Sequence, residues 1–344
     1  MARMPSKRLL FALLPSWWLI ACGSAGVSPA SAPSAGGSAA ANAPAKALSP
    51  VKGAFVAISA HTLPIWLGVD KGLFKQQGLD VQLTYVQGSV TAMPAMSAGD
   101  LHIIEATPAA SVQAQLKGQD TVALATHIPY ADYRLMAVPE VKTLQDLKGK
   151  AVGQTKAGTV DDVVIQYVLK KQGFTPGKDV SLTYLDTQPA ILAALERKLI
   201  QAAALSPPND VQAEKAGAHE ILNILQERYP YPVDGIVSTR KYVREHPEET
   251  VAFLKGYVQA LRYIKSNPEE TKREMAERTK LDDKQVLDEG YKVMAEALAD
   301  NPVPTTEGIA TVLPLFEGGQ GRNPADFIDP APLTRAIQEL GTGK

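Results

Sequence analysis

The feature that most constrains the fold is a strand–loop–helix–strand pattern between residues 55 and 83. Phe55 to Ile58 is a short apolar run bounded by polar residues, which is typical of a buried strand. Pro64 follows a polar loop and suits the first turn of a helix, where its missing N–H needs no partner. Leu79 to Leu83 alternates apolar and polar residues, the period of a second strand. Open α/β sheets bind ligands at loops of this kind, beyond the carboxyl ends of the strands.

The same rhythm of strand, polar loop and helix recurs along the chain and predicts an α/β protein with two lobes. Each lobe is expected to hold a mostly parallel sheet flanked by helices. From His246 onward the apolar residues follow helical spacing, so helices should dominate and pack on the first lobe. We therefore predict lobe 1 from residues 53–138 and 236–344, and lobe 2 from residues 139–235.

Four motifs resemble one family of transport proteins. They are G-V-D-K-G-L-F-K-Q-Q-G-L-D-V from Gly68, S-A-G-D from Ser97, L-Q-D-L-K-G-K-A-V-G from Leu144 and A-L-S-P-P from Ala204. Together they resemble substrate-binding proteins of ABC importers, in the branch that includes nitrate, sulfonate, taurine and thiamine-pyrimidine binding proteins. The resemblance extends from about Ala54 to the C-terminus. It implies the two-lobed periplasmic-binding-protein fold of type II and delivery of a solute to an ABC permease and its ATPase.

The N-terminus has the pattern of an export signal. Arg3, Lys7 and Arg8 precede an apolar segment, Leu9 to Ile20, that is too short to span a bilayer comfortably. Leu19-Ile20-Ala21-Cys22 resembles the lipobox of bacterial lipoproteins, which implies a signal peptide over residues 1–21 and a lipid, such as palmitate, on Cys22. Since Cys22 is the only cysteine, no disulfide forms within the chain, and acylation explains a lone thiol in an exported protein. An ordinary signal peptide or an anchor helix is the alternative.

Residues 22–52 are rich in Ala, Ser, Gly and Pro, and their only charged residues are Lys46 and Lys52. Nothing in this composition builds a core, so we predict a disordered tether. The protein should thus be lipid-anchored on the periplasmic or cell-surface side of a bacterial membrane. Without the leader, 32 basic residues (35 minus Arg3, Lys7 and Arg8) face 36 acidic ones. No basic tract points to nucleic acid, and we expect a monomer.

The sequence carries none of the common motifs for catalysis or metal binding. The chain has no G-x-S-x-G elbow, P-loop, H-E-x-x-H or strand-linked G-x-G-x-x-G, and its five histidines lack metal-ligand spacing. Asp161 and Asp162 are adjacent on a predicted helix and point apart, so we expect them to cap it and contact water. We predict no enzyme activity, no cofactor and no metal. The alternatives are an enzyme like the pyrimidine synthase of this branch, whose cysteine-rich motif is missing here, or a ligand sensor subunit.

Candidate ligand-binding residues follow the predicted strands, where exposed N–H groups and helix starts suit a polar or anionic group. His61 is the foremost candidate, because a polar loop residue has no core role to perform. Trp66 could stack on ligand or belong to the core, and Asp234 could face the cleft or pair locally. Serines and threonines at helix starts could also act only as caps. The other candidates are Thr62, Gly88, Ser89, Thr107 and Pro108 in lobe 1, and Gly158, Thr159, Gln188 and Ser206 in lobe 2.

These predictions combine into a tethered solute-binding protein that captures a small molecule by closing its lobes. The solute would be polar or anionic and could be sulfonate-, nitrate- or pyrimidine-like. No arginine occurs in the candidate loops of lobe 1, which disfavours a tightly paired doubly charged anion.

Overall fold

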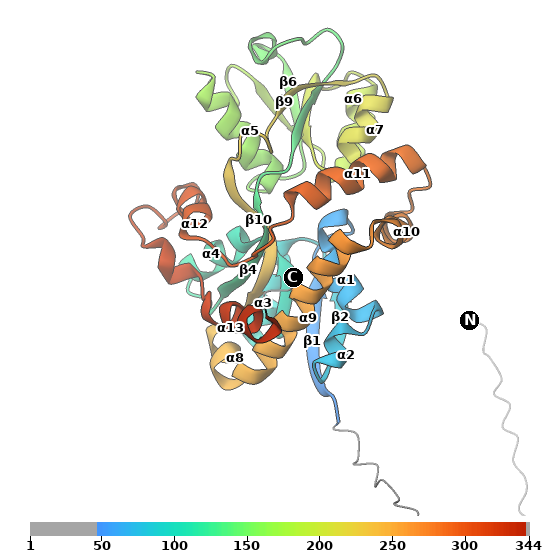
Figure 1. Ribbon diagram of the computed structural model, residues 1–344. Helices are drawn as coiled ribbons and strands as arrows, with labels where there is room; N and C mark the ends of the chain where they lie inside the picture. The colour runs from blue at the N-terminus through green and yellow to red at the C-terminus, as the bar shows by residue number, and fades with distance from the viewer. Residues whose placement is uncertain (1–46, 342–344) are drawn as a thin grey trace, which may run out of the picture. The chain divides into compact units, whose positions relative to one another are not determined.

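The structure of the protein is a computed structural model that describes residues 47–341 (Figure 1). Its strands form two five-stranded sheets, each flanked by helices, which confirms the predicted α/β class. The first sheet has the order β2 (Leu79–Tyr85), β1 (Ser49–Phe55), β3 (Ile103–Ala106), β10 (Pro230–Ser238) and β4 (Val122–Tyr130). The second has the order β7 (Ser181–Tyr184), β6 (Ala151–Gln154), β8 (Ala202–Leu205), β5 (Arg134–Ala137) and β9 (His219–Asn223).

The two sheets are built alike. In the first, β1 runs parallel to β2 and β3, whereas β10 is antiparallel to β3 and β4. In the second, β6 runs parallel to β7 and β8, whereas β5 is antiparallel to β8 and β9. The central strands β3 and β8 are buried at every residue, as expected for strands covered on both faces. We call the first sheet with its helices lobe 1 and the second lobe 2.

The chain passes between the lobes at two places. It leaves lobe 1 between β4 and β5, and it returns after β9 through the long strand β10. Gly235 lies where β10 bulges against β4, and a Cβ there would be 2.0 Å from the carbonyl oxygen of Ala125, so only glycine fits. Strand β5 belongs to the second sheet, and β10 joins the first sheet from Pro230. The lobe boundaries predicted at 138/139 and 235/236 therefore differ from the division of the strands between the two sheets. The sequence of an apolar strand does not show which other strand it pairs with.

The start of the described chain also differs from the prediction. Strand β1 begins at Ser49, so the last residues of the predicted tether belong to the sheet, and the strand predicted at Phe55 to Ile58 lies earlier. Val51 is fully buried, and Gly53 lets β1 approach the side chain of Leu83. Burial, rather than local composition, thus decides where the fold starts. The predicted signal peptide, Cys22 and tether residues 22–46 lie outside the described residues.

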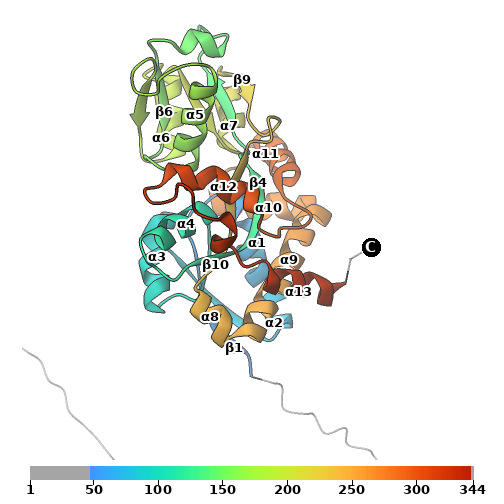
Figure 2. The same ribbon diagram turned by 90° about the vertical axis from the view of Figure 1, so that its left-hand side faces the viewer.

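Helices cover both sheets (Figures 1 and 2). In lobe 1 they are η1 (Ala60–Thr62), α1 (Leu63–Asp70), α2 (Leu73–Gln76), α3 (Ser89–Ala98), α4 (Pro108–Leu116), α8 (Arg240–Glu245), α9 (Pro247–Ser266), α10 (Pro268–Thr279), α11 (Lys284–Ala297), α12 (Thr306–Val312), η3 (Leu313–Leu315), η4 (Pro324–Phe327) and α13 (Ala331–Leu340). In lobe 2 they are η2 (Leu144–Leu147), α5 (Val160–Lys171), α6 (Gln188–Glu196) and α7 (Asn209–Lys215). Helix α9 packs on α2 through the stacked rings of Phe253 and Phe74, whose centroids are 4.6 Å apart.

Helix α11, one of the C-terminal helices expected to pack on lobe 1, also reaches lobe 2. It lies beside α7 of lobe 2, where Gly290 approaches Pro208 closely (Figure 1). At its start, Asp283 accepts two hydrogen bonds from Lys215 Nζ, at 2.6 and 2.5 Å. The helix therefore contacts both lobes.

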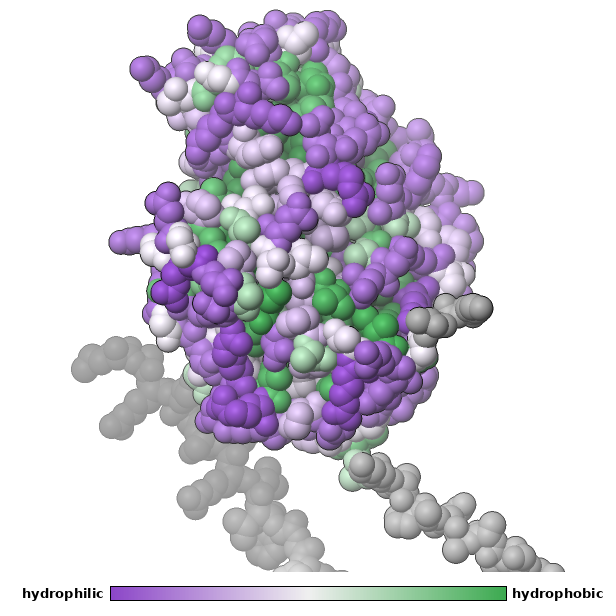
Figure 3. All heavy atoms as spheres, turned by 60° about the vertical axis from the view of Figure 1, so that its left-hand side comes forward, coloured by the Kyte–Doolittle hydropathy of each residue, from purple (hydrophilic) through white to green (hydrophobic). Residues whose placement is uncertain are grey.

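The surface mixes polar and apolar side chains. On the face in Figure 3, apolar residues are interspersed among hydrophilic ones. Within residues 47–341, no helix combines the length and the apolar character needed to cross a bilayer.

Candidate ligand-binding cleft

A cavity of about 460 Å³ lies between the lobes. Lobe 1 contributes the loop after β1 and η1, and lobe 2 contributes the starts of α6 and α7. Tyr133 from the crossover and the α10–α11 connection complete the wall. This is the edge where ligands bind in open α/β sheets. The lining residues are Ala57, Ile58, Ser59, His61, Tyr133, Gln188, Pro189, Ser206, Pro208, Asn209, Gln212, Thr279 and Leu281.

The lobe 2 side of the cavity carries a preorganised cluster of uncharged hydrogen-bonding groups. Gln188 Nε2 donates to Ser206 Oγ at 3.0 Å, and Gln188 Oε1 accepts from Ser206 N–H and Asn209 Nδ2, both at 3.1 Å. Thr187 caps α6 by accepting from the Ala190 N–H, which leaves Gln188 in the first turn of the helix. The predicted residues Gln188 and Ser206 thus lie together in the cavity.

His61 lies on the lobe 1 side of the same cavity. Its Nε2 is 2.7 Å from Asp132 Oδ2, and both residues are buried. Burial alone lowers the pKa of His61, but the carboxylates of Asp132, Asp234 and Asp210 together raise it above its ordinary value. The expectation that His61 has no core role is wrong, because its ring forms a buried pair with an acid that the sequence pattern does not reveal.

A chain of buried polar groups continues behind His61. His127 Nε2 lies 3.1 Å from the carbonyl oxygen of His61, and the Tyr257 hydroxyl bridges His127 Nδ1 at 2.7 Å and Glu105 Oε1 at 3.0 Å. Burial, followed by the charge of His61, lowers the pKa of His127 to about 3, so His127 is neutral. Burial and the nearby Asp234 raise the pKa of Glu105 well above its ordinary value. This network connects the cleft wall to α9.

Several predicted residues of lobe 1 have structural partners instead of lining the cavity. The Thr62 hydroxyl donates to the carbonyls of Ala57 and Ser59 and so shapes the loop. Trp66 is in the core, edge-on to Phe55 with ring centroids 5.3 Å apart, as in the core alternative.

The remaining lobe 1 candidates gather where α3 and α4 begin. Thr107 caps α4 and donates to the Pro232 carbonyl at 2.8 Å, while its N–H donates to Ser89 Oγ at 3.3 Å. Gly88 precedes α3 with φ of 88°, and Pro108 is buried in the first turn of α4. None of these four lines the 460 Å³ cavity.

The start of α5 differs from its prediction. Asp161 and Asp162 are buried instead of contacting water, because they bind the loop before the helix. Asp161 accepts from the Thr155 N–H at 2.5 Å and the Thr159 hydroxyl at 2.7 Å, and Asp162 accepts from the Gly158 N–H at 2.7 Å. Gly158 and Asp162 line a second cavity, of about 400 Å³, whose other wall includes residues 314–316 of lobe 1.

Asp234 is buried within β10 and accepts from its neighbour, the Gly235 N–H, at 2.8 Å. Burial raises the pKa of Asp234 to about 7, although the charge of His61 opposes this effect. It does not line the 460 Å³ cavity. Local pairing is therefore the better of the two sequence-based alternatives for this residue.

Several residues that line the cavity were not predicted from the sequence, chiefly Ser59, Tyr133, Asn209 and Gln212. Ser59 belongs to the same loop as His61, and Asn209 directly follows the S-P-P motif. The position of both residues in the sequence therefore indicated that they could line the cleft. No local sequence pattern indicated the role of Asp132, because its partner His61 is 71 positions away in the chain.

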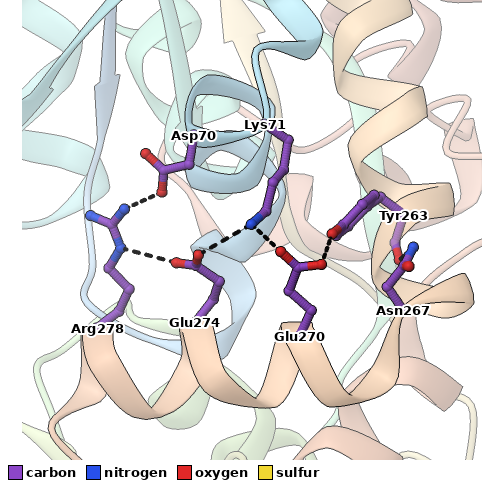
Figure 4. A network of polar contacts seen from close by, with 7 residues as sticks. All are labelled: Asp70, Lys71, Tyr263, Asn267, Glu270, Glu274 and Arg278. Carbon is purple, nitrogen blue, oxygen red and sulfur yellow. Dashed lines mark hydrogen bonds and ion pairs between the residues drawn. The ribbon is translucent and has the colours of Figure 1, made fainter.

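The α10–α11 wall is held to lobe 1 by an ion-pair network (Figure 4). Lys71, at the end of α1, contacts Glu270 and lies 3.5 Å from Glu274, and Arg278 contacts Asp70. These pairs fix the end of α10, so that the adjacent Thr279 and Leu281 are placed at the cavity.

The sequence profile of the family described as NMT1/THI5 like matches residues 59–271. This chain belongs to the NMT1/THI5-like family. The match begins at the loop that carries His61 and ends within α10, so it includes most of the cleft.

One relative and two solved structures are similar to this NMT1/THI5-like protein. YtlA of Bacillus subtilis, which is named as a binding protein, is 26% identical over 219 residues, 62% of this chain and 65% of YtlA. The match thus spans just under two thirds of that relative. A Bordetella bronchiseptica structure shares 23% identity with a TM-score of 0.71 over 85% of this chain and 98% of that one. The periplasmic aliphatic sulphonate binding protein SsuA of Escherichia coli shares 15% identity with a TM-score of 0.65, over 84% and 91%. The periplasmic-binding-protein fold predicted from the sequence is thereby confirmed.

Proposed function

We propose that this protein is the extracytoplasmic solute-binding component of an ABC importer and captures a small solute by closing its two lobes. The observation that carries the proposal is the 460 Å³ cavity, whose wall combines His61 of lobe 1 with Gln188 and Ser206 of lobe 2. A ligand that contacts both lobes at once stabilises the closed form by its differential affinity for that form. An ABC permease can then recognise the closed protein.

The size and chemistry of the cavity suit a small polar molecule. A volume of about 460 Å³ falls in the range of small-ligand sites, and the polar groups in it are few and convergent. The predicted classes, sulfonate-, nitrate- or pyrimidine-like solutes, all meet this size limit. SsuA is named as a sulphonate binding protein, and for this chain a sulfonate is one of the candidate ligands.

The proposal includes attachment to a membrane. The lipobox-like sequence before Cys22 would place the lipid about 26 residues before β1, which starts at Ser49. A flexible chain of that length has an end-to-end distance of roughly 30 Å. The binding domain would act as a monomer close to the permease and its ATPase.

Two measurements test the proposal. Mass spectrometry of small molecules released from the purified, denatured protein identifies a ligand, and small-angle scattering follows the refolded protein as this ligand is added. We expect the radius of gyration to fall at saturation. An unchanged radius at saturation would contradict the closure mechanism.

A matched pair of variants tests the site. Gln188→Ala should weaken binding by about 0.5–1.5 kcal/mol for each hydrogen bond lost to an uncharged ligand group. Gln145→Ala, an exposed glutamine in η2 of lobe 2, should leave the affinity unchanged. Calorimetry with equal losses in both variants, or none in either, would contradict the assignment of the cleft.

A further inference from the structure

The cavity between the lobes contains no free cationic group among its described lining residues. Lysine and arginine are missing from the lining, and His61 and Tyr133 are the only residues there with titratable side chains. The ring of His61 already faces Asp132 at 2.7 Å, so its positive charge has a carboxylate partner. Among the described lining residues, an entering anion would find no uncompensated cation.

Arg134, which follows the lining residue Tyr133 in the chain, is committed as well. Arg134, which begins β5, lies 3.5 Å from Asp210 and 3.0 Å from Glu214, and it also contacts Glu220. Three carboxylates therefore surround one guanidinium at the start of α7. The local balance on this side of the cleft is negative.

Beside the second cavity, two backbone donors before α5 are also occupied. The first turn of a helix presents unpaired N–H groups that bind anions. In the loop that leads into α5, Asp161 and Asp162 take the Thr155 and Gly158 N–H groups and the Thr159 hydroxyl, and both residues are only 2% exposed. These loop donors beside the second cavity are therefore not free to bind an anion.

The groups that do face the cavity suit an uncharged ligand. Gln188, Ser206 and Asn209 offer both donors and acceptors to a heteroatom edge. Ile58, which is 57% exposed, and Leu281 supply apolar contacts for the rest of the molecule. A neutral heterocycle or carboxamide combines such an edge with an apolar face.

We propose that the solute of this protein carries no anionic group and that the cleft excludes sulfonates, nitrate and carboxylates. The inference rests on the proposed binding function and narrows its ligand class. The physical reason is desolvation: a buried anion without a partner loses several kcal/mol of hydration that uncharged donors do not restore.

The test compares anions with matched neutral molecules. The probes are nitrate, methanesulfonate, and the pairs benzenesulfonate with benzenesulfonamide and nicotinate with nicotinamide, titrated into the purified full chain by calorimetry. We expect no saturable binding of any anion at concentrations up to about 10 mM. Saturable binding of any anion within this range that is abolished in Gln188→Ala overturns the proposal.

A charge-gain variant makes the test informative even if none of the neutral probes binds. Gln188→Arg places a free guanidinium in the cavity and should create binding of methanesulfonate or nitrate, improved at least about tenfold over the wild type. Gln145→Arg adds the same charge outside the cavity and should not. Asn209→Lys is the second variant if Gln188→Arg fails to fold by circular dichroism. If folded variants with the added cation gain no anion affinity, the missing cation is not the cause of exclusion and the proposal is wrong.

The released ligand supplies a direct check, because an anionic molecule that co-purifies with the protein and contracts it on rebinding overturns the ligand class. In that case the proposed binding function stands. A ligand that binds without contraction contradicts lobe closure instead, so the two failures are distinguishable.

Discussion

The ring of His61 and the carboxylate of Asp132 form a buried pair, with Nε2 2.7 Å from Oδ2. His61 belongs to η1 at the wall of the cleft, and Asp132 belongs to the segment between β4 and β5 where the chain crosses between lobes. The pair therefore ties the ligand-facing loop of lobe 1 to the crossover. Since neither side chain is exposed by more than 9%, solvent screens the pair little.

Asp132→Asn should destabilise the protein by about 3–5 kcal/mol, because it leaves His61 buried without its charge partner. The pKa of His61 is raised in the folded protein, so the pair's stabilisation is complete below the unfolded value of about 6.5. It is lost as pH rises through the folded pKa. Urea unfolding from pH 5.5 to 9 should show that the free energy of unfolding lost in Asp132→Asn becomes smaller as pH rises. The control variant Asp186→Asn, whose carboxylate is 81% exposed, should lose almost no free energy of unfolding. A loss of stability in Asp132→Asn that grows as pH rises would contradict a stabilising pair between charged His61 and Asp132.

Asp234→Asn should make the protein more stable at pH 8 and flatten its pH dependence. Burial raises the pKa of Asp234 to about 7, so the folded state binds an extra proton between about pH 4 and 7. Stability therefore falls as pH rises through this window, by up to a few kcal/mol, and asparagine removes that loss. Thermal unfolding at pH 5, 6.5 and 8 measures the difference. Asp100→Asn, an exposed acid in the same lobe, should leave the wild-type pH profile in place, whereas an identical profile for both variants would refute the prediction.

Lys215→Met should loosen the contact between α7 and α11, since it removes the pair with Asp283 that joins the lobes. A partly exposed pair of this kind contributes only about 0.2–1 kcal/mol and is screened by salt. We expect the unliganded variant to have a larger radius of gyration than the wild type at low ionic strength, with the difference vanishing in high salt. Lys171→Met removes a pair with Glu227, 3.1 Å long, within lobe 2 and serves as control. Equal changes in both variants would mean that the pair does not govern the lobe arrangement.

Cys22→Ala should prevent lipidation, because the lipobox-like sequence ends at this cysteine. The variant should be exported as an uncleaved or unacylated form. Detergent partitioning and mass spectrometry of the N-terminus measure the outcome. A processed, acylated variant would show that the lipobox interpretation is wrong.

Local patterns located some of the cleft but not its network. The loops after the strands were predictable because polar residues follow apolar runs, and Gln188 and Ser206 from two of these loops do lie together. Thr107 and Thr159 follow the same rule, yet their hydroxyls bond to the chain itself. A helix start looks alike in sequence whether its N–H groups are free or taken by a neighbouring carboxylate such as Asp161.

The sequence by itself determined the α/β class, the repeated strand–loop–helix units and the family, because hydrophobic period and turn residues act over a few positions. Only the tertiary structure decided that β5 joins the second sheet, that β1 starts at Ser49 and that His61 meets Asp132. Those outcomes depend on burial and charge pairing between residues far apart in the chain. The free energy of such contacts depends on both partners being buried together in the folded protein. It therefore cannot be predicted from a local pattern of residues.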